Sequence, residues 1–118
     1  MLKKATILAS TLCMGAMASM QLHVINDAIN EGARCLDGSA PAYYFKEGTT
    51  EKGKKNWVLF VQGGGWCYKE TDCYERSNND RGSSKYMPTE ISDGGPLDGN
   101  YPFNLFHSFS FSFIPIYF

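Results

Sequence analysis

The sequence lacks a strong charge of either sign and the glycine motifs of nucleotide-binding proteins. Its 118 residues carry a formal net charge of −1, which gives no electrostatic footprint for nucleic acid. It contains no G-x-G-x-x-G pattern and no lysine in P-loop spacing, so neither a dinucleotide site nor a phosphate-binding loop is indicated. Soft metal ligands are also scarce, because His23 and His107 are the only histidines and the cysteines form no second close pair. We therefore expect neither a metal nor a cofactor.

The composition that remains is typical of a folded protein. Hydrophobic residues make up 43% of the chain and charged residues 19%, a balance that favours a packed core over disorder. A chain of this length has room for one small domain. The chemistry must therefore be sought in local motifs.

The N-terminus has the pattern of a secretory signal peptide. Lys3 and Lys4 precede an apolar, small-residue run over residues 5–17, and Ala-Met-Ala at 16–18 supplies a cleavage pattern. The run is shorter than the ~20 residues that span a bilayer as a helix. We predict a signal peptide over 1–18 and a secreted mature domain over 19–118, with no membrane association after cleavage. An uncleaved anchor is the alternative.

Cleavage would remove Cys13 and leave an odd number of cysteines. Cysteines in an oxidising compartment usually pair, and Cys67 and Cys73 close a short loop that makes them a natural couple. Cys35 is then left over. An odd cysteine in a secreted chain indicates a missing or external partner.

Three apolar segments predict β-strands. Residues 42–45 follow the turn signal Asp37-Gly38, and residues 109–113 alternate Phe and Ser with the period of a strand. Residues 57–61 form a continuous apolar run, which indicates a strand covered on both faces, as in the central sheet of an α/β fold. The predicted fold class is α/β.

The run at 57–61 leads into Gly63, Gly64 and Gly65, followed by Trp66. Glycines let a loop leave a strand with positive φ and let a substrate approach the backbone. In α/β-hydrolases a glycine-rich loop of this kind donates an N–H to the oxyanion of the tetrahedral intermediate, and each such donor lowers the barrier by about 2.7–4 kcal/mol. A glycine-rich turn that merely packs a tryptophan is the structural alternative, and spacing alone leaves both interpretations open.

Several short motifs occur in one fixed order along the chain. They are Cys35-Leu36-Asp37-Gly38-Ser39 with Pro41 and Tyr43-Tyr44, then Asn56-Trp57, Gly63-Gly64-Gly65-Trp66-Cys67, Cys73, and Gly82-Ser83-Ser84-Lys85-Tyr86-Met87. In this combination the sequence resembles the pectin acetylesterase family, which also contains Notum-like carboxylesterases. The resemblance extends over about residues 22–106.

The resemblance implies an α/β-hydrolase-like fold and assigns roles to particular residues. Gly65 and Trp66 match the positions whose backbone N–H groups form the oxyanion hole, and the Trp66 ring would line the acyl pocket. Cys67 and Cys73 match a family disulfide. Cys35 matches a cysteine whose partner lies in a Tyr-Cys segment that relatives carry after the strand corresponding to residues 113–115.

The chain departs from the family in the catalytic triad. Family members use Ser, His and Asp, with the serine in a G-x-S-x-G-like elbow, and no such elbow occurs here. His23 and His107 match no catalytic position. We therefore expect the N-terminal part of an α/β-hydrolase-like fold, truncated before the nucleophile elbow and inactive alone.

The full-length protein implied by the resemblance would be a secreted ester hydrolase located in the cell wall or secretory pathway. It would deacetylate an acetylated polysaccharide, or cleave another acyl ester, through a serine acyl-enzyme. The alternative is a non-catalytic secreted binding or decoy module, or a pseudogene product.

Overall fold

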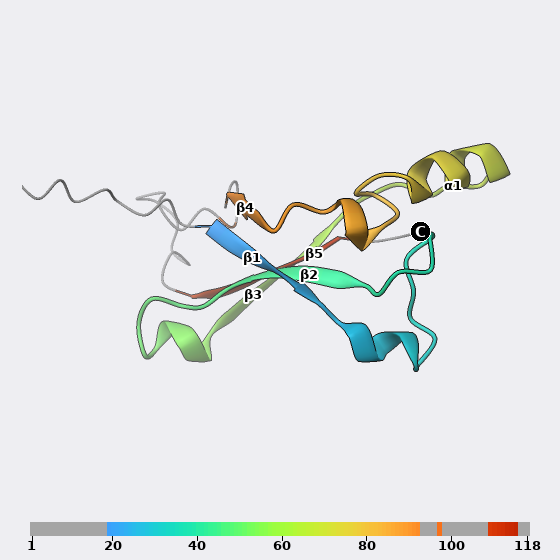
Figure 1. Cartoon of the computed structure of the whole chain (residues 1–118). Coiled ribbons are helices and arrows are strands. Elements are labelled where there is room, and N and C mark those ends of the chain that lie inside the picture. Colours follow the sequence, from blue (N-terminus) through green and yellow to red (C-terminus); the bar gives the residue numbers. More distant parts are fainter. Residues whose placement is uncertain (1–18, 93–96, 98–108, 116–118) are drawn as a thin grey trace, which may run out of the picture.

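The computed structural model describes residues 19–92, 97 and 109–115 (Figure 1). The predicted signal peptide at 1–18, Cys13 and His107 lie outside these residues. The strands are β1 (Ser19–Val24), β2 (Ala42–Lys46), β3 (Trp57–Gln62), β4 (Glu90–Ser92) and β5 (Ser110–Pro115), and the α-helix is α1 (Glu70–Ser77). Short 3-10 helices are η1 (Asn26–Ile29), η2 (Gly53–Lys55) and η3 (Ser84–Tyr86).

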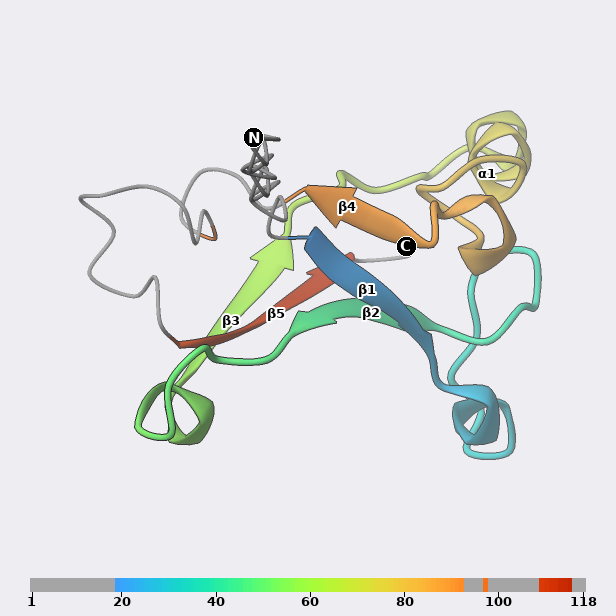
Figure 2. The same ribbon diagram turned by 60° about the vertical axis from the view of Figure 1, so that its left-hand side comes forward.

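The strands form one mixed sheet in the order β3-β5-β2-β1-β4. β3 and β5 are parallel, with Trp57 opposite Ser110 and Gln62 opposite Pro115. The pairs β5–β2, β2–β1 and β1–β4 are antiparallel. Because β3 and β5 point the same way, both strands end at the same edge of the sheet, where ligand sites of open α/β folds are found. Figure 2 shows these two strand ends side by side.

The three predicted strands are confirmed. β2 and β3 contain the segments 42–45 and 57–61, and β5 covers the Phe/Ser alternation from Ser110 onward. Within β5, Ser110 and Ser112 are buried, and the Ser110 hydroxyl accepts a hydrogen bond from the Gly48 N–H at 3.0 Å. Burial of the Ser110 hydroxyl is therefore offset by hydrogen bonding, as buried polar groups require.

The core is a small cluster that joins the sheet to the segments on either side of β4. Its buried members are Met20, Ala42, Tyr44, Met87 and Leu97, with Leu22, Val58, Ile91 and Phe113 packed against them. The Tyr44 hydroxyl donates to the Pro88 carbonyl at 2.8 Å, so the ring end is satisfied inside the cluster. Burial, followed by the charge of Asp80, raises the pKa of Tyr44.

The prediction that the strand at 57–61 is covered on both faces is wrong for the described chain. Among the described strands β3 lies at the edge of the sheet with β5 as its only neighbour, and Trp57, Leu59 and Val61 are 55%, 65% and 53% exposed. Covering a strand requires a helix with an apolar face, and α1 has no buried residue. α1 lies beyond the end of the strand and not across its face (Figures 1 and 2).

Candidate functional site

The glycine cluster forms the loop that leaves the carboxyl end of β3. Within it Gly65 has φ +67°, a left-handed conformation that side chains with a Cβ rarely adopt. Gly63 does not need glycine for this reason, since its φ is not positive and a Cβ there would meet no heavy atom within 4 Å. Within the cluster, Gly65 is therefore the position whose backbone conformation requires glycine.

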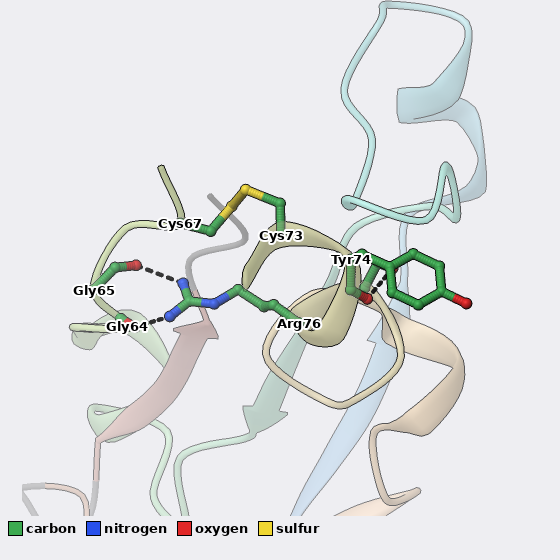
Figure 3. The surroundings of a disulfide bond; sticks show 7 residues. Gly64, Gly65, Cys67, Cys73, Tyr74 and Arg76 are labelled. Atoms are coloured by element: carbon green, nitrogen blue, oxygen red, sulfur yellow. Dashed lines mark hydrogen bonds between the residues drawn. A yellow bond between two sulfur atoms is a disulfide. The ribbon is translucent and has the colours of Figure 1, made fainter. Parts of the chain in front are cut away.

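The predicted disulfide is present between Cys67 in this loop and Cys73 in α1, with a Cα–Cα distance of 5.1 Å (Figure 3). It connects the loop to the helix only six residues later in the sequence. Cys35 carries a free, buried thiol that donates to the Ala40 carbonyl at 3.4 Å.

A second connection between helix and loop comes from Arg76. Its Nη1 donates to the Gly65 carbonyl at 2.5 Å and its Nη2 donates to the Gly64 carbonyl at 2.8 Å. Figure 3 shows the guanidinium reaching from α1 to the two carbonyls beneath the disulfide. Sequence reasoning missed both Arg76 and its helix. The available signal was the three-residue spacing of Cys73 and Arg76, which places two side chains on one helix face.

A cavity of about 350 Å³ adjoins the loop at the shared edge of β3 and β5. Its lining residues are Gln62, Gly63, Gly64, Asp80, Arg81 and Pro115. Gly65 and Trp66 do not line it among the described residues, and the Trp66 side chain is 81% exposed. The loop thus presents Gly63 and Gly64 toward the strand ends and the Trp66 side chain toward solvent.

Two of the sequence motifs meet around the Asp37 carboxylate. The backbone N–H of Ser39 donates to Oδ1 at 3.0 Å, the Ser39 hydroxyl donates to it at 2.5 Å, and the buried Ser83 hydroxyl donates to Oδ2 at 2.8 Å. Lys85 Nζ forms an ion pair with Oδ2 at 2.9 Å. The Asp37-Gly38 turn is also confirmed, with Gly38 at φ +80°. These contacts dock the turn onto η3.

The Asp37 network predicts a stability change in acid. Burial alone would raise the pKa of Asp37, but the hydrogen bonds from Ser39, Lys85 and Ser83 outweigh it and hold that pKa well below its usual range. A depressed carboxyl pKa contributes stability that is complete above the unfolded pKa of about 4 and is lost as pH falls below it.

We expect the free energy of unfolding to fall between about pH 5 and pH 2 in the wild type, and to be less dependent on pH in Asp37→Asn. At pH 6 the Asp37→Asn variant should be less stable by about 1–3 kcal/mol, because the buried Ser83 hydroxyl loses a charged acceptor. Denaturant unfolding at several pH values measures both effects. An equal slope with pH in the two proteins would contradict the assignment.

The remaining candidates occupy ordinary positions. His23 is exposed and stacks on Tyr43, with a ring-centroid distance of 5.3 Å. The described residues contain no group of three or more His, Cys, Asp or Glu side chains arranged to hold a metal ion. Among the described helices, none has both the length and the apolar character needed to cross a bilayer.

Comparison with solved structures identifies the fold class of this chain. The Wnt deacylase Notum from Drosophila superposes with a TM-score of 0.67 at 21% sequence identity, over 85% of this chain and 28% of that structure. The chain therefore has a mixed α/β sheet of the α/β-hydrolase-like type.

The family follows from the sequence matches. A model of the pectinacetylesterase family matches residues 13–105, and the chain belongs to that family. Pectin acetylesterase 7 of Arabidopsis thaliana is 35% identical over 100 residues, which cover 85% of this chain. The palmitoleoyl-protein carboxylesterase NOTUM of Schmidtea mediterranea is 38% identical over 85 residues, 70% of this chain. The chain spans 25% of the length of the first relative and 16% of the second.

Proposed function

We propose that residues 19–118 are the N-terminal portion of a secreted carboxylic-ester hydrolase, preceded by a signal peptide at 1–18. The complete protein would remove acyl groups, chiefly O-acetyl from polysaccharide, through a serine acyl-enzyme. Family membership supports the reaction class. The observation that carries the proposal is the loop after β3, in which Gly65 is left-handed and the carbonyls of Gly64 and Gly65 are bound by Arg76.

In this reaction the role of the described chain would be to stabilise the negative charge of the oxyanion. A serine from beyond Phe118 would attack the ester carbonyl carbon while a histidine of the same later part of the protein takes its hydroxyl proton, and the carbonyl π electrons would move to oxygen to form the oxyanion. The backbone N–H groups of Gly65 and Trp66 would donate to that oxygen, as preoriented donors do in acyl transfer. Collapse of the intermediate would reform the carbonyl and break the bond to the leaving oxygen, which takes the proton from the histidine and departs as the alcohol, leaving the acyl-serine. The Trp66 ring, exposed in this chain, would line the acyl pocket once later segments cover it.

Secretion is supported by the disulfide between Cys67 and Cys73, since such bonds persist in oxidising compartments. The free thiol of Cys35 is buried and available for a partner cysteine in a following segment. Acetylated polysaccharide, or another acyl ester, is the proposed substrate.

The proposal is tested by sequencing the transcript through and past the codon for Phe118. The protein encoded by the complete transcript and the 118-residue chain are then each assayed for acetate release from acetylated pectin. We expect the reading to continue, in this or a shifted frame, into a Tyr-Cys segment and a serine elbow, and its product to release acetate. The 118-residue chain alone should release none.

Two outcomes would overturn the proposal. A stop codon directly after Phe118 would favour a non-catalytic binding module or a pseudogene product. Acetate release by the 118-residue chain, abolished by mutating one of its own serines, would show that the nucleophile lies within these 118 residues.

A further inference from the structure

We propose that Arg76 is a positioning residue that aims the backbone N–H groups of Gly65 and Trp66 at the developing oxyanion. This inference rests on the proposed function and adds to it a residue that does not itself touch the substrate. Arg76 lies in the last turn of α1, eleven residues after the glycine whose carbonyl it binds.

Peptide geometry links the carbonyls that Arg76 binds to the two N–H groups. All peptide bonds of the described residues are trans, and in a trans peptide the C=O and the following N–H point in opposite directions. The Gly64 carbonyl shares its peptide plane with the Gly65 N–H, and the Gly65 carbonyl shares its plane with the Trp66 N–H. A group that binds both carbonyls therefore sets the direction of both N–H groups.

One guanidinium binds both carbonyls. Because Nη1 and Nη2 lie in one plane, the Gly64 and Gly65 carbonyls must turn toward the same side of the loop. Both following N–H groups then face the opposite side. Consecutive N–H groups on one side of a turn with a left-handed residue form a known anion-binding arrangement, and Gly65 supplies that residue.

The positive charge of Arg76 also favours binding of the oxyanion. A cation hydrogen-bonded to a carbonyl polarises the peptide unit, which strengthens the N–H at its other end as a donor. Lysine would supply a similar charge but only a point donor, without the planar fork that spans two carbonyls. The arrangement therefore requires arginine specifically.

The rest of the helix holds Arg76 in place. Cys73 lies three residues earlier on the same helix face, and its bond to Cys67 keeps α1 against the loop. Gly82 allows the following segment to pass close to the Arg76 backbone, where a Cβ would clash. These contacts fix the helix end from which the side chain extends.

Residual dipolar couplings test the inference, because they report the orientation of single N–H vectors. The protein translated from the complete transcript is labelled with [15N]Gly and [15N]Trp and compared as wild type, Arg76→Lys, Arg76→Gln and Arg34→Gln. Arg34 is a matched control, since its Nη2 also donates to a backbone carbonyl, that of Ile29 at 3.4 Å, in a different loop.

We expect the Gly65 and Trp66 couplings to change in both Arg76 variants while the Trp57 coupling in β3 stays the same. Arg34→Gln should leave all three unchanged. In acetyl-ester hydrolysis, kcat of Arg76→Gln should fall by about 10- to 100-fold with little change in KM. This loss is smaller than the 10²–10³-fold loss of kcat when an oxyanion donor is removed. Arg76→Lys should not retain the wild-type kcat.

Unchanged Gly65 and Trp66 couplings in a folded Arg76→Gln protein would overturn the positioning role. If Arg76→Gln does not fold, the same couplings are measured in Arg76→Lys, and unchanged Gly65 and Trp66 couplings there would overturn the positioning role. A wild-type protein without esterase activity would refute the proposed function instead. The couplings would still report whether Arg76 orients the loop, so the two failures are distinguishable.

Discussion

Alanine at Gly82 is expected to lower the free energy of unfolding by about 3 kcal/mol, a large share of the 5–15 kcal/mol that stabilises a typical domain. A Cβ at this position would lie 2.6 Å from the Arg76 carbonyl carbon and 2.9 Å from the Ser77 nitrogen, with the Arg76 oxygen closer still. These atoms belong to the backbone of α1, so no side-chain rotation can relieve the overlap. The segment after the helix must move away or the helix end must unwind.

Gly63→Ala is the matched control for this substitution. Its added Cβ would meet no heavy atom within 4 Å, and its backbone is not in the left-handed region. We expect its unfolding midpoint to stay close to that of the wild type, while the Gly82→Ala midpoint falls clearly. Thermal and denaturant unfolding of the protein from the complete transcript measure both. Equal midpoints for the two variants would contradict the close packing of Gly82 on α1.

The strands and the disulfide were accessible from the sequence because each depends on local pattern. The apolar run of β3, the Phe/Ser alternation of β5 and the six-residue cysteine spacing are visible in one window of residues. The strand order was not accessible in this way. β5 lies between β3 and β2 although it is the last of the described strands in sequence order, and such pairing depends on contacts between distant segments.

The exposure of β3 shows how an apolar pattern can mislead. The run at 57–61 predicted a strand covered on both faces, and the described chain leaves most of it exposed at the sheet edge. A continuous apolar run indicates a strand that a complete sheet and its helices bury. The described segments supply one neighbouring strand and no apolar helix.

The contribution of Arg76 could not be predicted for a different reason. α1 is short and polar, so it lacks the apolar periodicity by which helices are recognised, and a disulfide holds it where burial does not. The contact of Arg76 with two backbone carbonyls depends on the loop conformation at Gly65. Sequence motifs identified the loop, and the structure was needed to identify what orients it.

We predict that the Gly65 and Trp66 N–H groups stabilise an oxyanion, and a pair of substitutions at Trp66 tests this role. Trp66→Ala and Trp66→Pro both remove the indole ring, but only proline also removes the backbone N–H. If the N–H is a donor in acyl transfer, its loss should lower kcat by about 10²–10³ beyond the loss caused by removing the ring.

The decisive measurement is kcat for acetate release from acetylated pectin by the two variants, made in the protein from the complete transcript. Their unfolding midpoints serve as the control for folding. We predict that Trp66→Pro is about 10²–10³-fold slower than Trp66→Ala, with the difference in kcat and not in KM. Equal rates in two folded variants would contradict the oxyanion role of this loop.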